Sequence, residues 1–319
     1  MNVPLRALGD VEVADREEFR RDVLAGLAAQ PRAIPAKYLY DARGSALFDA
    51  ICELPEYYPT RTETAILRDC ADDIAGLAGS GCVLVEYGSG SSVKTRLLLD
   101  AMHDLDGYVP IDISRRHLET TAARLRRDHP GLRVEPVFGD YMAVDALPPS
   151  INGRRRIGFF PGSTIGNLTP DEATAFLRRA RRLLRDDGAL ILGVDLKKDH
   201  RRLHDAYNDS AGVTAQFTLN LLRRMNRELD ATFDLSAFTH DAFYDPVAGR
   251  IEIYFRSLRD QTVRVAERPF AFAKGERVHT EYSYKYDDAG IEALARSGGF
   301  EVARFWTDAA RQFAVVFLR

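Results

Sequence analysis

The chain has 319 residues, of which 45% are hydrophobic and 29% are charged, a composition typical of a soluble globular protein of one or two domains. Its net charge of −3 gives no support to a nucleic-acid surface, and no apolar run has the length that spans a membrane. The N-terminus is too polar for a signal peptide, and the three cysteines lack CxxC spacing. We therefore expect a cytoplasmic protein without a structural metal or a disulfide framework.

From residue 60 onward, the sequence predicts alternating helices and strands. Thr60 and Glu63 have the spacing of a capping box, which predicts a helix over 60–76. Further helices are predicted over 93–105, 114–131 and 169–188. Strands are predicted at 82–87, 107–114, 132–141, 155–162 and 189–196. This alternation predicts an α/β fold with a doubly wound parallel sheet, whose site lies at the carboxyl ends of the strands.

After residue 196 the alternation stops. Residues 197–245 have a helical, polar pattern, and 250–258 with 261–272 resemble an antiparallel pair of strands. Residues 300–319 read as strand, turn and strand. We interpret the middle segment as an insertion that joins the N-terminal segment in a second, α+β domain, and we expect the final hairpin to return to the main sheet.

Three predicted strand ends carry residues suited to an adenosine cofactor. Glu86, Gly88, Ser89 and Gly90 form a glycine-rich turn, Asp112 can accept both ribose hydroxyls, and Asp140 with Tyr141 can meet the adenine. Each signal alone is weak, because a GxG turn is often only a turn and a strand-end Asp is often a helix cap. Their succession on three strands favours a cofactor site.

The glycine-rich turn also bears on which cofactor is bound. A nicotinamide fingerprint requires Gly where Val93 stands, and a P-loop requires Gly before Lys94-Thr95. An acidic residue before the turn, Glu86, suits a cofactor with a cationic end. S-adenosylmethionine, which carries an ammonium and a sulfonium, fits better than a dinucleotide.

A second unusual stretch is FFPGSTIGNLTP at 159–170. Thr169, Pro170 and Glu172 predict the start of a helix. The preceding loop offers backbone amides, two hydroxyls and the Asn167 carboxamide, which can both accept and donate hydrogen bonds.

Together, the motifs resemble those of the bacterial histidine Nα-methyltransferases, which make trimethylhistidine (hercynine) in ergothioneine biosynthesis. The stretches that carry the resemblance are 54–63, 87–101, 159–170, 206–217 and 279–286. The resemblance covers essentially the whole chain. It implies a Rossmann-like seven-stranded methyltransferase domain at 61–196 and 287–319, and a substrate-binding domain at 1–60 and 197–286. It also implies a small-molecule enzyme, which we expect to be monomeric.

The resemblance further implies roles for individual residues. S-adenosylmethionine would be held by the cofactor set Glu86, Gly88, Ser89, Gly90, Lys94, Asp112, Asp140 and Tyr141. Histidine would be held by Tyr57, Gly162, Asn167, Tyr207, Glu281 and Ser283, beside Ile253 and Tyr282. Ile253 stands where relatives carry Met, and a strand would point Tyr282 away from Glu281 and Ser283.

Methyl transfer from a sulfonium depends mainly on positioning the reactants. The attacking amine must be neutral, and because a free α-amino group has a pKa of about 7.7–8.0, no dedicated base is required. Tyr40 and Asn167 are our candidate catalytic residues, with Tyr40 receiving the proton. The faces of Tyr40 and Tyr57 can stabilise a quaternary ammonium by cation–π contact.

Each substrate-side residue also has a structural interpretation. Either Tyr57 or Tyr58 can be a packing residue, Tyr207 can belong to the core, Asn167 can be a turn residue, and Glu281 can pair with Lys285 in a helix. Two alternative functions remain at this stage. The fold could methylate another amino acid, such as a tryptophan derivative, or it could be a silent cofactor-binding module.

Overall fold

The computed structural model describes residues 8–89 and 93–319, which form two compact units. Unit 1 contains the described residues up to Tyr57, together with His200–Pro246 and Ile251–Tyr282. Unit 2 contains Tyr58–Asp199, Val247–Arg250 and Ser283–Arg319. Cofactor binding by 61–196 with 287–319, and amino-acid binding by 1–60 with 197–286, stay predictions.

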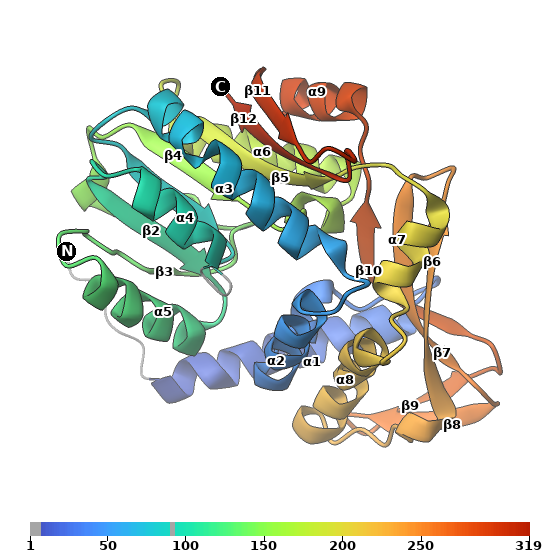
Figure 1. The fold of residues 1–319 in the computed structure, drawn as a ribbon. Helices are drawn as coiled ribbons and strands as arrows, with labels where there is room; N and C mark the ends of the chain where they lie inside the picture. The colour runs from blue at the N-terminus through green and yellow to red at the C-terminus, as the bar shows by residue number, and fades with distance from the viewer. Residues whose placement is uncertain (1–7, 90–92) are drawn as a thin grey trace. The chain divides into compact units, whose positions relative to one another are not determined.

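Unit 2 is built on a seven-stranded sheet in the order β11-β12-β5-β4-β1-β2-β3 (Figure 1). The strands are β1 (Val83–Tyr87), β2 (Gly107–Asp112), β3 (Val137–Phe138), β4 (Arg156–Phe160), β5 (Ala189–Asp195), β11 (Val302–Thr307) and β12 (Phe313–Leu318). β1 to β5 pair in parallel, whereas β12 is antiparallel to both β5 and β11. The predicted α/β fold is confirmed, and so is the return of the final hairpin to the main sheet.

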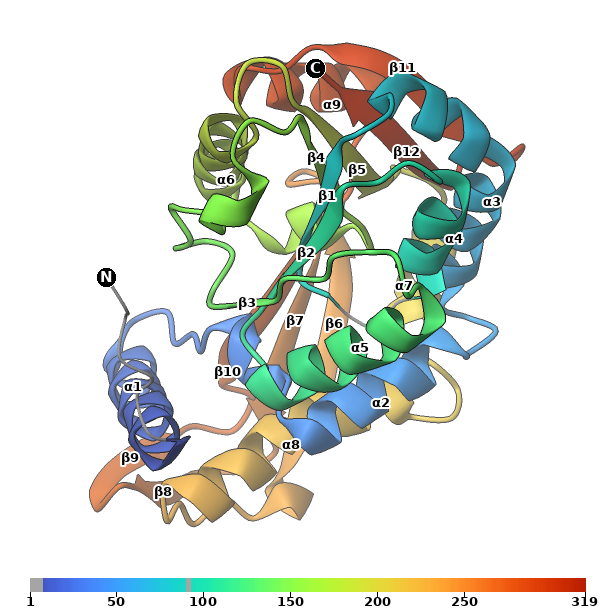
Figure 2. The same cartoon turned by 90° about the vertical axis from the view of Figure 1, so that its left-hand side faces the viewer.

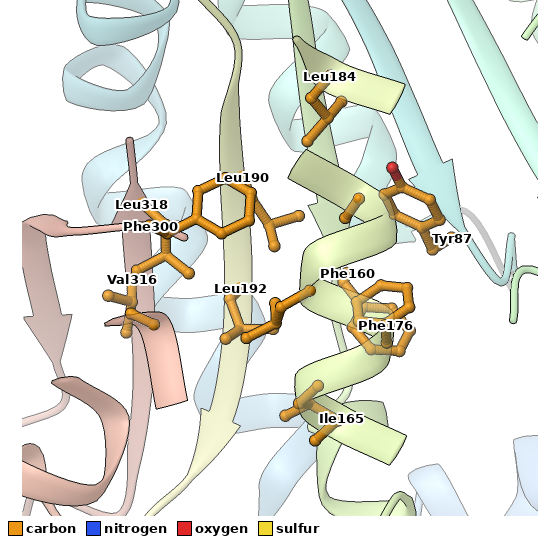
Figure 3. Close-up of a cluster of buried hydrophobic side chains, with 14 of the residues drawn as sticks. Tyr87, Phe160, Ile165, Phe176, Leu184, Leu190, Leu192, Phe300, Val316 and Leu318 are labelled. Atoms are coloured by element: carbon orange, nitrogen blue, oxygen red, sulfur yellow. The ribbon is translucent and has the colours of Figure 1, made fainter. Parts of the chain in front are cut away.

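Helices cover both faces of this sheet (Figure 2). One face packs against α3 (Tyr58–Ala78), α4 (Val93–Ala101) and α5 (Arg115–Asp128). The other packs against α6 (Pro170–Leu184) and α9 (Asp288–Ser297), where Figure 3 shows the buried cluster around Phe160 and Phe176. β1, β4 and β5 are buried along their whole length, which explains their continuous apolar runs.

Local features explain why the start of α6 agrees with the prediction, whereas the start of α3, the length of β3 and the end of α6 do not. The capping box at Thr60 is wrong, since α3 begins at Tyr58. β3 is much shorter than predicted because Pro136 has no amide hydrogen to donate to the sheet. α6 has the predicted capping box on Thr169 but ends before Arg185, which has a φ of 68°, rather than at Gly188.

Unit 1 combines helices with two small sheets. Its helical elements are α1 (Leu8–Ala28), η1 (Ala36–Leu39), α2 (Ala42–Cys52), α7 (His200–Tyr207), α8 (Val213–Glu228) and η4 (Leu235–Ala237). One sheet has the order β10-β7-β6, formed by β10 (Arg277–Tyr284), β7 (Arg250–Ser257) and β6 (Phe238–Asp245). The other is the hairpin of β8 (Gln261–Val265) and β9 (Arg268–Phe272). Across the described parts of both units, no helix has the length and apolar character needed to cross a membrane.

Two predictions for unit 1 are wrong. The segment 238–245 is a strand rather than a helix, because its backbone pairs with β7 at the edge of the three-stranded sheet. Residues 261–272 form a hairpin by themselves instead of pairing with 250–258. The turn of that hairpin places Ala266 and Glu267 at φ 46° and 67°, a conformation usually signalled by Gly or Asn.

Candidate active site

Those predicted cofactor residues of unit 2 that the structure describes lie at the carboxyl ends of its strands. Because β4, β1, β2 and β3 are neighbours, the segments that follow them adjoin at their carboxyl ends. The Gly88 amide donates to the Ile111 carbonyl over 2.9 Å, and the Gly139 amide donates to the Asp112 carbonyl over 3.0 Å. Gly88 has a φ of 78°, and a Cβ there would lie 3.9 Å from the Tyr141 ring. The turn and the aromatic ring are therefore neighbours.

Asp112 and Asp140 share the same local geometry. One carboxylate oxygen of each accepts a hydrogen bond from the amide two residues later, Ser114 in one case and Met142 in the other, both over 2.7 Å. These side chain to backbone bonds fix the orientation of both carboxylates at the sheet edge.

Glu86, the penultimate residue of β1, is only 3% exposed. Its carboxylate accepts hydrogen bonds from the Thr95 hydroxyl over 2.8 Å and from the Tyr108 hydroxyl. Burial raises the pKa of Glu86 to about 7, although both hydrogen bonds favour the ionised form. A cationic ligand would favour the ionised form of Glu86 further. The prediction that Glu86 suits the cationic end of a cofactor requires this ionised form.

Ser89, the next residue of the turn, fits a bound cofactor. Ser89 is 1% exposed, and among the described residues its hydroxyl has no hydrogen-bond partner. A buried unpaired hydroxyl costs free energy unless a ligand or water satisfies it. Gly90, also predicted to bind the cofactor, lies outside the described residues. The ligand that these residues fit is S-adenosylmethionine, which supplies an electrophilic methyl group on a sulfonium.

The loop between β4 and α6 has a strained backbone. Gly162 and Ser163 take consecutive left-handed conformations, with φ of 76° and 56°, and Asn167 ends the short helix η3 (Thr164–Asn167). The Ser163 hydroxyl accepts the Asp195 amide over 2.9 Å. Such conformations persist only where neighbouring groups hold them, and they often occur at functional sites.

Glu63 is the main residue that holds this loop, and sequence reasoning misassigned it. Rather than capping α3, its carboxylate accepts the Gly162 amide at 3.0 and 2.9 Å. It also pairs with the ammonium of Lys94, which was predicted to bind the cofactor. The structure thus brings Lys94 and Gly162 together through a residue outside the predicted set.

A buried group of charges lies at the end of β5. The Asp195 carboxylate accepts hydrogen bonds from Tyr58 at 2.8 and 2.9 Å and pairs with Lys198 at 2.5 Å and Lys285 at 2.7 Å. Burial disfavours ionisation, but the two ammonium groups still hold the pKa of Asp195 below its usual range. Burial lowers the pKa of Lys198 to about 8. Lys285 also donates to the Ser283 hydroxyl over 2.7 Å.

Unit 1 contains a cluster of five aromatic rings that includes three predicted substrate residues. The Tyr40 ring lies 5.6 Å from Phe48 and 5.4 Å from Phe217, both edge-on. Tyr57 lies 6.3 Å from Phe48 and 6.2 Å from Tyr207. Burial, followed by the proximity of Tyr207, raises the pKa of Tyr57 well above its usual value, so this phenol stays neutral. We call these five residues the aromatic cluster.

Glu281, Tyr282 and Ser283 lie in β10, and Ile253 lies in the neighbouring strand β7. Glu281 and Ser283 are buried, whereas Tyr282 is half-buried and its ring lies 3.9 Å from that of His279. This alternation is that of a strand, which removes the helical pairing of Glu281 with Lys285 considered above. Ile253 in β7 is buried, and its carbonyl accepts the Thr280 hydroxyl over 3.0 Å.

Sequence reasoning missed four residues that surround the predicted ones: Glu63, Lys285, Phe48 and Phe217. A signal existed for Glu63, because it falls on the stripe of α3 that also carries Leu67 and Cys70. Phe48 looks like an ordinary helical core position, and Phe217 ends the stretch 206–217 that carries the family resemblance, but neither residue is itself of a type that signals a site. Among the described residues, no group of His, Cys, Asp or Glu side chains has an arrangement that could hold a metal ion.

The fold and this sheet edge define an S-adenosylmethionine-dependent methyltransferase. Residues 19–319 match the family described as histidine-specific, S-adenosylmethionine-dependent methyltransferases, and the chain belongs to that family. It is 44% identical to a histidine N-alpha-methyltransferase of Mycolicibacterium smegmatis over 94% of both chains. It is 42% identical to a histidine N-alpha-methyltransferase of Mycobacterium tuberculosis over 95% of both chains. Ergothioneine biosynthesis protein 1 of Neurospora crassa is 32% identical over 87% of this chain and 32% of that longer protein.

Proposed function

We propose that this enzyme transfers three methyl groups from S-adenosylmethionine to the α-amino group of L-histidine and so makes trimethylhistidine (hercynine) for ergothioneine biosynthesis. The family and the names of the two mycobacterial relatives support histidine as the substrate. The name of the fungal relative supports the pathway. A monomeric, cytoplasmic enzyme is part of the same proposal.

The observation that carries full methylation is the aromatic cluster. Each methyl transfer leaves the nitrogen more substituted, and the final product keeps a permanent positive charge. Aromatic faces attract quaternary ammonium groups without requiring a hydrogen bond from them. Tyr40, flanked edge-on by Phe48 and Phe217, suits each methylation state of the amine.

The proposed roles of the site residues follow from their chemistry. Asn167, with Gly162 close by, orients the amino and carboxyl groups, and Tyr40 receives the proton that the amine loses. Glu281 and Ser283 hold the imidazole nitrogens, with Tyr57 and Tyr207 beside them and Ile253 and Tyr282 shaping the surroundings. The carboxylates of Asp112 and Asp140, with Glu86, Gly88, Ser89, Gly90, Lys94 and Tyr141, hold the cofactor.

The test is incubation with S-adenosylmethionine and the twenty amino acids, followed by mass spectrometry of the products. We expect histidine to gain three methyl groups. Histidine that stops at one or two would contradict complete methylation, whereas methylation of tryptophan instead would contradict the substrate. No methylated product would favour a silent cofactor-binding module.

A further inference from the structure

Glu63 is a carboxylate where the helix pattern expects an apolar side chain. It lies on the stripe of α3 that faces the sheet, in line with Ile66, Leu67 and Cys70, and its side chain is 0% exposed. Burial of a carboxylate is costly unless it is paired and hydrogen-bonded. Both partners of Glu63, the Gly162 amide and the Lys94 ammonium, belong to the candidate site.

These two partners lie side by side. A Cβ on Gly162 would be 3.7 Å from the Lys94 ammonium nitrogen. Glu63 accepts the Gly162 amide at 3.0 and 2.9 Å with its two oxygens and pairs with Lys94 through one of them. A lysine ammonium has three donors, so this pair leaves Lys94 with hydrogen-bonding capacity for a carboxylate ligand.

The sheet leaves space for this arrangement at Gly193 in β5. A Cβ there would lie 2.1 Å from Oε1 of Glu63 and 3.3 Å from the Gly162 nitrogen. Any other residue at 193 would displace the carboxylate from the loop. Gly193 is thus a second, independent feature that keeps Glu63 in place.

We propose that Glu63 is a positioning residue that couples the cofactor site to the amino-acid site. One carboxylate fixes both the Lys94 ammonium and the backbone of the loop 161–167. When a cofactor carboxylate binds Lys94, the ion pair between Lys94 and Glu63 changes. Because the same Glu63 carboxylate accepts the Gly162 amide, this change displaces the loop directly. This inference rests on the proposed function, because it takes Lys94 as a residue that binds the cofactor and the loop 161–167 as a segment that binds the amino acid.

The experiment measures histidine affinity by calorimetry with and without S-adenosylhomocysteine, the demethylated form of the cofactor. Coupling between two ligand sites typically changes affinity by about 5–150-fold. We expect at least about a fivefold effect in the wild type and a factor near one in Glu63→Gln, which keeps an acceptor for Gly162 but loses the charge beside Lys94. The affinity for each ligand alone should change by less than that factor. Gly193→Ala, whose Cβ would displace the Glu63 carboxylate, should reproduce the loss of coupling while the chain keeps the Glu63 side chain.

Glu172→Gln is the matched control, because Glu172 caps α6 at the far end of the same loop and is exposed. It should keep the wild-type coupling. Equal coupling in wild type and folded Glu63→Gln would overturn the proposal, and so would the absence of coupling in the wild type. If the wild type methylates another amino acid, the proposed function fails. The same measurements with that amino acid then decide the role of Glu63 separately.

Discussion

The candidate cofactor site of unit 2 and the aromatic cluster of unit 1 are built in different ways. In unit 2, each element contributes a short loop at a strand end, and the parallel sheet brings these loops together. In unit 1, the cluster joins rings from α2, α7, α8 and the segments beside them, and side-chain packing positions them. The candidate cofactor site therefore depends on backbone turns and charges, whereas the aromatic cluster depends on the shape and electrostatics of its rings.

Of the variants that test this comparison, Asp195→Ala in the charged region of unit 2 should have the largest effect on free energy. Removing Asp195 breaks its buried ion pairs with Lys198 and Lys285. Breaking a buried ion pair typically costs about 3–5 kcal/mol, so we expect a loss of that size in the free energy of unfolding. Chemical denaturation measures it. Asp288→Asn, which breaks an exposed pair with Arg311, is the control and should cost about 1 kcal/mol or less.

The assignment of the substrate side chain is tested by Glu281→Ala. If Glu281 accepts a hydrogen bond from the imidazole, its loss should weaken histidine binding by about 1.5–3 kcal/mol and leave S-adenosylmethionine binding nearly unchanged. Competition among histidine, tryptophan and phenylalanine, with products counted by mass, extends the test. Wild type should strongly prefer histidine, and Ile253→Met should keep that preference. Normal methylation of histidine by Glu281→Ala would remove Glu281 from the site.

On the cofactor side, Asp112→Ala should weaken S-adenosylmethionine binding by about 1.5–3 kcal/mol, the value of a charge-assisted hydrogen bond. Calorimetry on the folded variant measures this effect, and histidine binding without cofactor serves as the control. An unchanged cofactor affinity would show that the Asp112 carboxylate only caps the following turn through Ser114.

Glu86 predicts a pH dependence for the same site. Its pKa of about 7 means that the carboxyl is largely protonated at pH 6, and only the ionised form attracts a cationic ligand. Cofactor affinity should therefore rise with pH, by about fivefold between pH 6 and 7, and Glu86→Gln should flatten this rise. Because the folded pKa exceeds the ordinary 4.5, the folded state holds the extra proton, so this group lowers stability as pH rises from 4.5 to about 7. A flat affinity in the wild type would argue against a cationic partner.

The smallest effect is expected for Tyr40→Phe in the aromatic cluster. The ring and its contacts with Phe48 and Phe217 remain, so histidine binding should stay within about tenfold, the loss of one neutral hydrogen bond being worth near 1 kcal/mol. Methyl transfer should slow if the hydroxyl receives the amine proton. Single-turnover rates from pH 6 to 9 measure this, and rates equal to the wild type would leave Tyr40 as a packing residue.

The same comparison explains what could be predicted from the sequence. Unit 2 follows the regular alternation of strands and helices, so its fold and the proximity of Gly88, Asp112 and Asp140 could be inferred from the order of the elements. Glu63 was misassigned because a capping-box spacing occurred two residues inside a helix that begins at Tyr58. Local spacing could not reveal that its partner is Gly162, far along the chain.

Unit 1 was harder to predict because its signals are weak or distant in sequence. The hairpin turn at Ala266–Glu267 lacks the Gly or Asn that usually marks such a turn. The resemblance to the family suggested Tyr40, Tyr57 and Tyr207, but nothing in the sequence around Phe48 and Phe217 shows that their rings pack against them. Long-range packing of ordinary core residues completes this cluster.

The C-terminal hairpin has a consequence for how the protein is made. β5 ends at Asp195, but its antiparallel neighbour β12 begins only at Phe313, after the residues that form α7, α8 and all strands of unit 1's sheets have been synthesised. Until β12 leaves the ribosome, the strand β5, which is apolar except for Asp195, has an unpaired edge that can pair with another chain. The nascent enzyme therefore carries an aggregation-prone edge through much of its translation, and β12 removes it late.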